Sequence, residues 1–349
     1  MARAATKDSA AKRTPKAAEA SKGAAAKSAP IKKATAPLGA PHRHVAARDA
    51  RDRFTLGLFD ALWQRYRERV SHVQAYEEVV RRAGATFVND HIAFRTIAAQ
   101  KPATGISTLS RIFSALGYAA AGCYHFPDKY LSSLHFEHPV AGFPKLFVSE
   151  LELWHFPPQI RRAILRTLAS HHDPLADDVL AALRGLNDQT DDARRKLHVR
   201  LLRWFHELPW DPPSRAAVEE VNAASQFAAW VLVHGYNVNH FTASINSHGV
   251  EALGDIEKTI AALRAAGVPM KAEIEGARGS KLRQSATEAA VVDVPIRQGS
   301  KTGRMPWTYA YFELAERGEV TDAGGERRRF EGFLGPQATQ LFEMTRVKK

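Results

Sequence analysis

The chain has almost no cysteine and no long apolar run, and these two absences narrow its class. Cys123 is the single cysteine in 349 residues, which excludes an internal disulfide and a zinc site built from several thiolates. No stretch reaches the roughly eighteen apolar residues of a membrane span, and the N-terminus lacks the apolar core of a secretory signal. Because 45% of the residues are hydrophobic, the chain still has enough apolar side chains for a sizeable core. We therefore expect a globular protein of the cytoplasm.

Positive charge is concentrated at the N-terminus. The formal net charge is +12, but residues 1–45 contain ten Lys and Arg against only Asp8 and Glu19. The rest of the chain therefore carries only about +4. The N-terminal part consists largely of Ala, Lys, Ser, Thr and Pro, which bury too little surface to offset the entropy lost on ordering. We predict a disordered tail over residues 1–48, with weak nucleic-acid contact as an alternative to a solubilising or targeting role, and a single catalytic domain over residues 49–349.

A histidine-containing phrase occurs twice. N-D-H-I-A-F-R-T begins at Asn89, and V-N-H-F-T-A-S begins at Val238. Each reads as a short strand with a histidine near its start, and each is followed by a helical pattern and further strand-like runs. This order predicts two β-α-β-β-β modules, at about 85–153 and about 234–317, separated by a helical insert at about 154–233.

The expected elements follow from hydrophobic periodicity and from turn residues. Amphipathic helices are predicted from Arg53 to about Ala83, and a final helix at about 335–346. In the first module we expect a strand, a helix and three strands at His91–Ile97, Ile106–Leu116, Ala119–Phe126, Tyr130–Phe136 and Leu146–Leu153. The second module repeats this order at His240–Ile245, Asp255–Ala266, Ala272–Glu275, Leu282–Val294 and Thr308–Glu316.

Strand alternation groups polar residues that suit a metal site. Residues two apart in a strand share a face, which places His91 with Arg95, and Glu313 with Tyr309 and Tyr311. Two imidazoles and one carboxylate suit Fe(II), Mn(II) or Zn(II), and with open positions they form the ligand set of non-haem Fe(II) oxygenases. We predict that His91, His240 and Glu313 are the ligands. Glu316 is the rival carboxylate, on the opposite face of its strand.

The repeat suggests a partner for Glu313 in the first module. F-V-S-E-L-E-L from Phe147 lies where Y-F-E-L-A-E-R lies in the second module, which makes Glu150 the expected mate of Glu313. Glu150 is then a fourth ligand, a vestigial ligand, or a carboxylate that hydrogen-bonds the site. His234 is expected to have a structural role or to support the ligands, with substrate contact as a further alternative.

Further polar residues suggest how a substrate binds. Arg95 is the predicted anion clamp, because a guanidinium binds a carboxylate through two hydrogen bonds and keeps its charge at any working pH. The polar run Arg283, Gln284 and Ser285 interrupts an otherwise apolar β region and suggests additional substrate contacts.

Six phrases resemble one known family, the DUF1338 family of 2-oxoadipate dioxygenases/decarboxylases. They are N-D-H-I-A-F-R-T at Asn89, P-K-L-F-V-S-E-L at Pro144, H-G-Y-N-V-N-H-F-T at His234, L-R-Q-S-A-T at Leu282, Y-F-E-L-A-E-R-G at Tyr311 and G-F-L-G-P-Q-A at Gly332. The resemblance covers almost everything after residue 50. Together the phrases are much more specific than any one of them.

The resemblance implies an α+β vicinal oxygen chelate fold, in which paired β-α-β-β-β modules form a curved sheet around an Fe(II) site. His91, His240 and Glu313 occupy the positions of the family's ligands, and Arg95 that of its substrate-binding arginine. The implied reaction converts 2-oxoadipate and O2 to 2-hydroxyglutarate and CO2 in lysine catabolism. The implied partners are thus a small 2-oxo dicarboxylic acid and dioxygen, while the oligomeric state stays open.

Two other functions compete with this reading. One is a glyoxalase-like isomerase or lyase that uses its metal as a Lewis acid without oxygen, and direct metal ligation by Glu150 would favour it. The other is a non-catalytic protein that binds a small anion.

Overall fold

The computed structural model describes residues 41–172, 175–322, 324–334 and 345. Residues 41–48 do not continue the predicted tail. His42 is 2% exposed, and its Nδ1 lies 2.7 Å from Asp60 Oδ1. Residues 1–40 and most of the predicted C-terminal helix lie outside the described residues. No described helix is both long enough and apolar enough to cross a membrane.

The first two helices lie where the pattern from Arg53 to Ala83 predicts them. They are α1 (Ala50–Arg69) and α2 (Ser71–Ala83). The Asp49 side chain accepts a hydrogen bond from the Asp52 N–H and so caps α1, while α2 ends at Gly84, whose φ of 66° suits glycine. Trp63 of α1 packs against the rings of Phe87, Phe241 and Phe312. These contacts fix the helix pair against the sheet.

The first module contains the five elements that its pattern predicts. They are β1 (Asn89–Ile97), α3 (Ile106–Ala115), β4 (Ala119–Phe126), β5 (Leu131–Glu137) and β6 (Lys145–Leu151). Strand β6 runs parallel to β1 and antiparallel to β5, which pairs with β4. A two-residue hairpin, β2 (Ala99–Gln100) and β3 (Ala103–Thr104), precedes α3.

The second module repeats the start of this plan and then departs from it. It contains β7 (Val238–Ser244), α9 (Ile256–Ala265), β8 (Leu282–Ala286) and β11 (Glu313–Arg317), with β11 parallel to β7 and antiparallel to β8. The strand predicted at Ala272–Glu275 is absent from this described part, where only isolated bridges such as Glu275 to Gln284 occur. The second module therefore contributes three strands to the main sheet.

Two further strand predictions are wrong in their bounds. The single strand expected at Leu282–Val294 is divided into β8 and β9 (Val291–Gln298), and the strand expected at Thr308–Glu316 into β10 (Lys301–Thr308) and β11. Strands β9 and β10 form a separate antiparallel hairpin. Bonds from Tyr309 N to Ala290 O and from Thr287 N to Phe312 O hold the two connecting segments side by side. The chain thus leaves the sheet and returns to it, and Tyr309 and Tyr311 lie just before β11.

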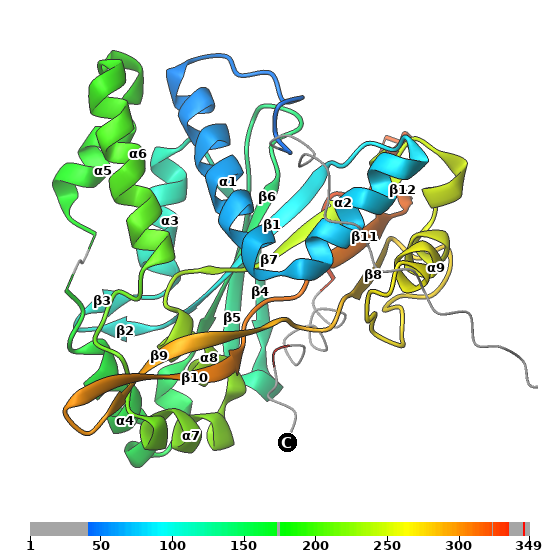
Figure 1. The fold of residues 1–349 in the computed structure, drawn as a ribbon. Coiled ribbons are helices and arrows are strands. Elements are labelled where there is room, and N and C mark those ends of the chain that lie inside the picture. Colours follow the sequence, from blue (N-terminus) through cyan, green and yellow to red (C-terminus); the bar gives the residue numbers. More distant parts are fainter. Residues whose placement is uncertain (1–40, 173–174, 323, 335–344, 346–349) are drawn as a thin grey trace, which may run out of the picture. The chain divides into compact units, whose positions relative to one another are not determined.

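The modules meet at the centre of one seven-stranded sheet. Its order is β4-β5-β6-β1-β7-β11-β8. Strands β1 and β7 pair antiparallel, with His91 opposite Thr242 and Ala93 opposite His240. In Figure 1, α3 lies to the left and α9 to the right of the central strands; α3 packs against β5 and β6, and α9 against β8 and β11. The arrangement brings the two repeated histidines onto neighbouring central strands.

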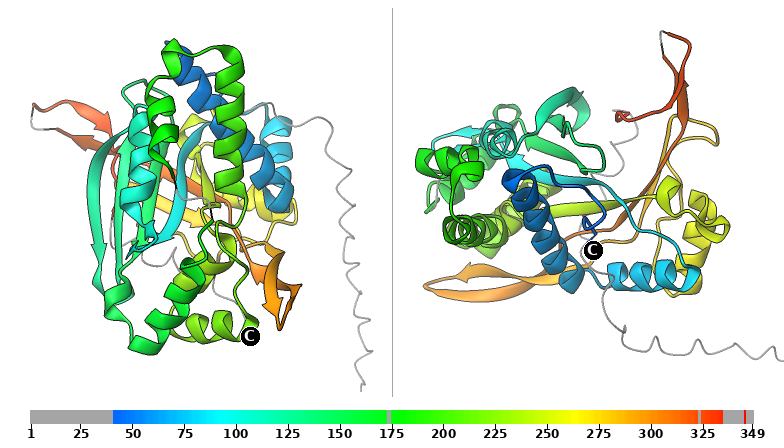
Figure 2. Two further views of the ribbon diagram at one scale, coloured as in Figure 1. Left: turned by 90° about the vertical axis from the view of Figure 1, so that its left-hand side faces the viewer. Right: turned by 90° about the horizontal axis from the view of Figure 1, so that it is seen from above.

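The helical insert covers part of the sheet. It comprises α4 (Pro158–Leu168), α5 (Asp177–Arg184), α6 (Asp191–His206), α7 (Arg215–Ala224) and α8 (Gln226–His234). Helix α6 packs beside α1, and both views in Figure 2 show the two helices side by side. From Phe227 to His234 every residue of α8 is buried, which explains why this segment is apolar all round. A small hairpin of β12 (Glu319–Thr321) and β13 (Arg327–Arg329) follows β11.

Candidate metal centre

Three buried side chains from both modules converge at the centre of the sheet. His91 Nε2 lies 3.3 Å from Glu313 Oε1, and His240 Nε2 lies 3.3 Å from Glu313 Oε2. One nitrogen or oxygen of each residue lies within 4.8 Å of the others. The exposed fractions are 2% for His91, 8% for His240 and 0% for Glu313. Strand pairing explains the convergence, because Thr242 on β7 is level with both His91 on β1 and Glu313 on β11.

Each histidine is oriented by the residue immediately before it. His91 Nδ1 lies 2.8 Å from Asp90 Oδ1, and His240 Nδ1 lies 3.0 Å from Asn239 Oδ1. Since carboxylate and amide oxygens accept hydrogen bonds, both imidazoles donate from Nδ1 and turn Nε2 towards Glu313. This tautomer is the one that a metal-ligating histidine needs.

The protonation states also suit a cation. Burial lowers the pKa of His240 to about 3, which keeps it neutral. Burial alone would raise the pKa of Glu313, but the neighbouring His240 and His91 outweigh it and hold that pKa below its ordinary value. For His91, burial lowers the pKa, and the Glu313 and Asp90 carboxylates outweigh it and hold the pKa above its ordinary value. An added cation would displace the proton that these carboxylates favour on His91.

One buried oxygen tests whether a metal fits. Gln284 Nε2 donates to Glu313 Oε1 at 2.6 Å, while Glu313 Oε2 has no hydrogen-bond partner among the described residues. A buried carboxylate oxygen without a donor is costly unless a cation neutralises it. The two imidazole nitrogens and this oxygen therefore fit a divalent transition metal.

A pocket that is partly open to solvent adjoins the three ligands. Its lining combines the ligands with polar and aromatic groups: His91, Ala93, Phe94, Arg95, Phe147, Ser149, Asn239, His240, Gln284, Tyr311, Glu313, Phe333 and Leu334. Tyr311 stacks on His240 with 4.7 Å between ring centroids. Phe333 meets His91 edge to face at 4.9 Å. The pocket is thus polar on the sheet side and aromatic at its wall.

Arg95 lies in this pocket with its side chain almost fully buried. It is 2% exposed, and its Nη1 donates to Thr345 Oγ1 at 2.7 Å. The guanidinium lies over the rings of Phe227, at 4.9 Å, and Trp230, at 5.4 Å. Burial raises the pKa of the adjacent Tyr311 well above its ordinary value, so this phenol stays neutral beside the guanidinium. A fixed cation and a neutral hydroxyl therefore share one end of the pocket.

Comparisons with known proteins show the family of this chain. Residues 58–344 match the family model described as 2-oxoadipate dioxygenase/decarboxylase. The chain belongs to this family. It is 26% identical over 280 residues to the chloroplastic 2-oxoadipate dioxygenase/decarboxylase of Arabidopsis thaliana, covering 73% of this chain and 67% of that protein.

Solved structures show the same fold. A glyoxalase superfamily protein from Ralstonia eutropha has a TM-score of 0.71 at 24% identity and covers 86% of this chain and 91% of its own. The hydroxyglutarate synthase of Oryza sativa, solved with 2-oxoadipate, has a TM-score of 0.68 at 23% identity and covers 90% and 98%. The predicted α+β fold, a curved central sheet with added helices, is confirmed.

In this member of the 2-oxoadipate dioxygenase/decarboxylase family, the polar run of β8 divides between two faces. Gln284 reaches Glu313 in the pocket. Arg283 instead donates to Glu257 at 2.6 Å and to Glu316 at 3.2 Å, and Ser285 donates to the Glu273 carbonyl at 3.2 Å. Alternation along the strand causes the division, and the expectation that Arg283 and Ser285 contact substrate is corrected.

Glu150 lies away from the metal centre. Its Oε2 accepts a 2.7 Å hydrogen bond from the Ile106 N–H at the start of α3. The preceding Gly105 has a φ of 104°, a conformation that favours glycine, and a Cβ there would lie 2.6 Å from this oxygen. In the second module, Glu316 Oε2 accepts a 2.7 Å bond from the Ile256 N–H at the start of α9. Glu150 is therefore the counterpart of Glu316, and its predicted pairing with Glu313 and its role as a ligand are corrected.

His234 and Tyr309 also lie outside the pocket. His234 Nε2 donates to the Thr308 carbonyl at 2.9 Å, and its ring packs against Trp230 and Tyr309. Burial lowers the pKa of His234 to about 3. The structural alternative for His234 thus agrees with its contacts, whereas Tyr309 does not share a strand face with Glu313.

Several pocket residues escaped the sequence reasoning. Asp90 and Asn239 carried a usable signal, because each precedes its repeated histidine. Phe147, Ser149 and Phe333 carried none, since aromatic and small residues of this kind are common in any core. Arg317 was hidden for a different reason: it becomes important only through contacts with Asp90 and with a segment fifteen residues later.

Proposed function

We propose that this protein is an Fe(II)-dependent dioxygenase that converts 2-oxoadipate and O2 to 2-hydroxyglutarate and CO2 in lysine catabolism. The carrying observation is that a two-histidine, one-carboxylate cluster shares one pocket with buried Arg95. Membership of the 2-oxoadipate dioxygenase/decarboxylase family supports the same reaction. Carbon, hydrogen and oxygen balance without any other substrate.

His91, His240 and Glu313 would hold the ion. Fe(II) at this ligand set supplies the redox chemistry that activates dioxygen, and leaves coordination positions for a 2-oxo acid. Asp90 and Asn239 keep both imidazoles in the ligating tautomer. Gln284 fixes one oxygen of Glu313, and the other oxygen would then be available to hold the ion.

Arg95 would bind the distal carboxylate of the substrate. Its guanidinium keeps its charge, and its packing over Phe227 and Trp230 fixes its position. Anchoring the far end of the diacid holds its carbon chain in one orientation, which makes an internal oxidation effectively unimolecular. Tyr311, neutral beside it, can donate a hydrogen bond to a substrate oxygen. Phe147 and Phe333 limit the access of water to the same space.

Reconstitution decides whether the reaction is correct. The protein would be loaded with Fe(II) without oxygen and then given O2 with 2-oxoadipate or with shorter and longer 2-oxo diacids. We expect oxygen uptake, equimolar CO2, and 2-hydroxyglutarate from 2-oxoadipate. No oxygen uptake with any of these acids would overturn the dioxygenase assignment.

Removing the Arg95 charge tests the role of the clamp. Arg95→Ala should lower kcat/KM by at least roughly 30-fold, because losing one partner of a desolvated charge pair costs about 2 kcal/mol or more. Iron content, measured by elemental analysis, should stay within about twofold, since the residue lies beyond the ligands. An equal loss of iron and activity would show a structural role instead.

The two rival functions differ in their support. Direct metal ligation by Glu150 would have favoured the glyoxalase-like alternative, but this carboxylate binds the N–H at the start of α3 instead. Simple anion binding would use the same Arg95 without oxygen uptake. A cytoplasmic location and an accessory role of the tail stay predictions, and deleting residues 1–40 should leave turnover unchanged.

A further inference from the structure

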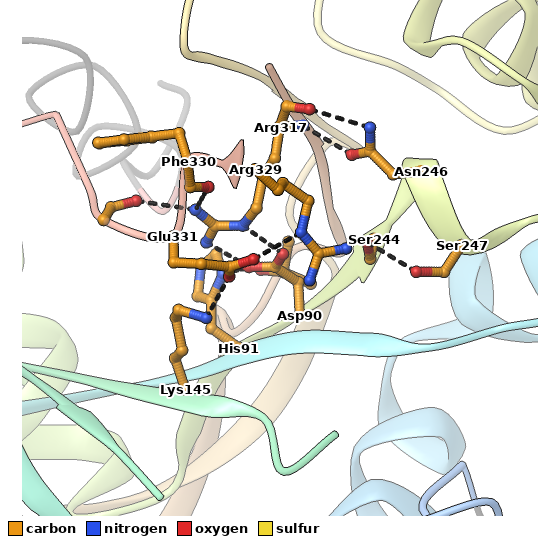
Figure 3. Close-up of polar contacts among 12 residues, drawn as sticks. Asp90, His91, Lys145, Ser244, Asn246, Ser247, Arg317, Arg329, Phe330 and Glu331 are labelled. Carbon is orange, nitrogen blue, oxygen red and sulfur yellow. Dashed lines mark hydrogen bonds and ion pairs between the residues drawn. The ribbon is translucent and has the colours of Figure 1, made fainter. Parts of the chain in front are cut away.

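Arg317 is a buried residue at the end of β11. It contacts both Asp90, beside the ligand His91, and the segment that carries Phe333. Its Nε and Nη2 donate to the two oxygens of Asp90 at 2.6 Å and 2.7 Å. Its Nη1 donates to the carbonyls of Phe330, at 3.2 Å, and Gly332, at 2.8 Å. The side chain is 0% exposed. Figure 3 shows the guanidinium between Asp90, beside His91, and Phe330 of the following segment.

The Asp90 contact reaches the metal ligand directly. Asp90 Oδ1 lies 2.8 Å from His91 Nδ1, so the oxygen that meets the guanidinium also meets the imidazole. His240 has the neutral Asn239 in the equivalent place, and among the described residues the Asn239 Nδ2 has no hydrogen-bond partner that could fix it in the same way. A carboxylate that orients a ligating imidazole influences metal affinity by roughly 10–100-fold. Arg317 therefore fixes the group that orients His91.

The carbonyl contacts reach the pocket wall. Residues 330–334 form no regular secondary structure, so side chains and isolated backbone bonds must hold them. Phe333 lines the pocket and lies 4.9 Å from both the His91 and the Phe147 ring centroids. The Arg317 guanidinium is 5.3 Å from the Phe333 ring. Additional support comes from the Lys145 to Glu331 ion pair at 2.6 Å.

We propose that Arg317 is a positioning residue that couples the orientation of His91 to the closure of the pocket wall at Phe333. This inference rests on the proposed function, because it takes the pocket as the place where a 2-oxo diacid binds. All three nitrogens of this guanidinium donate hydrogen bonds. Two bind Asp90, which orients the ligand His91, and the third binds the segment whose Phe333 lines the pocket. Loosening it should thus weaken metal binding and substrate binding together.

The test compares Arg317→Met with a matched control, Arg283→Met. Arg283 is also a buried arginine that joins two carboxylates, Glu257 and Glu316, but it lies on the face of β8 away from the pocket. Co(II) replaces iron without oxygen, and its absorption spectrum reports both ion affinity and the binding of 2-oxoadipate. Asp90→Asn and Phe333→Leu separate the two contacts of the guanidinium.

We expect Arg317→Met to weaken Co(II) binding by about 10-fold or more and also to weaken 2-oxoadipate binding, with an altered Co(II) spectrum. Arg283→Met should change both affinities by less than about threefold, because its role is structural. Asp90→Asn should weaken mainly the metal, and Phe333→Leu mainly the diacid. If Arg317→Met does not fold, Arg317→Lys, which keeps the charge but not the paired hydrogen bonds, is judged by the same criteria.

Equal effects of Arg317→Met and Arg283→Met on Co(II) affinity would overturn the proposal, and so would loss of one affinity without the other. Failure of the proposed function looks different: the wild-type protein would then bind Co(II) without responding to 2-oxoadipate. In that case the Co(II) affinities alone decide whether Arg317 positions His91, and the diacid arm is refuted with the substrate assignment.

Discussion

The first module has Phe147 where the second has Glu313. Counting two residues on from each histidine gives Ala93 on β1 and Thr242 on β7. Ala93 is level with Phe147 on β6, and Thr242 is level with Glu313 on β11. The two modules thus offer the same backbone position to the metal centre, but only one places a carboxylate there. One side of the site is a ligand and the other is an aromatic pocket wall.

A second pair of positions is alike in both modules. Glu150 and Glu316 each accept a hydrogen bond from the first N–H of the helix in their own module, α3 or α9. Each carboxylate satisfies a backbone N–H that has no acceptor within its helix, at the positive end of the helix dipole. The carboxylate that binds the start of the helix is therefore present in both modules, whereas the residue at the candidate metal centre differs between them.

The largest expected effect separates the two carboxylates that resemble each other in sequence. Glu313→Gln should weaken metal binding by more than about 100-fold, since partners outside the ligand sphere alone are worth roughly 10–100-fold. Glu150→Gln should leave it within about twofold. Metal titration of both variants measures the difference, and similar losses would restore Glu150 to the site.

Making the first module resemble the second should block turnover. Phe147→Glu places a second carboxylate beside the ligands, where it competes for the open coordination positions. We expect metal to be retained and oxygen uptake to fall by about 10-fold or more, with Phe147→Leu as the matched control. Normal turnover by Phe147→Glu would mean that Phe147 does not border the reacting centre. The expected ratio corresponds to roughly 1.4 kcal/mol of barrier.

Removing the helix-start carboxylates should cost stability without loss of metal. Glu150→Ala leaves the Ile106 N–H without its acceptor, which costs about 1–3 kcal/mol. Glu316→Ala should cost more, because it also removes one of the two partners of Arg283. Urea denaturation of the metal-free protein measures both, and a larger cost for Glu150→Ala would contradict this order.

The smallest effect is a pH dependence at Glu150. Burial raises the pKa of this carboxyl above its ordinary value of 4.5, against the opposite influence of the Ile106 N–H. Between the unfolded and folded pKa values the native state therefore binds more protons than the unfolded state. Stability of the wild type relative to Glu150→Gln should fall as pH rises through that window. A stability difference independent of pH there would refute the shift.

The repeated histidines and the order of elements were accessible from sequence, because alternation and helical periodicity are local properties. The residue-by-residue correspondence between the two modules was not accessible from sequence. Matching the Glu-Leu letters pairs Glu150 with Glu313, whereas the strand pairing places Glu150 with Glu316, three residues later. Alternation along β8 predicts that Gln284 points to the opposite face from Arg283 and Ser285. Which of the two faces lines the pocket depends on how β8 pairs with β11. Asp90 was visible beside His91, while its partner Arg317 depends on a long-range contact.

The central adjacency of β1, β7 and β11 has a thermodynamic consequence. All three ligands come from consecutive strands of one sheet, so the cation site exists only when strands from both halves of the chain are assembled. An ion that binds the folded but not the unfolded chain stabilises it by about 2.7 kcal/mol at a hundred times its dissociation constant. Chelation should therefore lower the melting temperature of the whole sheet, which makes heat resistance a report of cation occupancy.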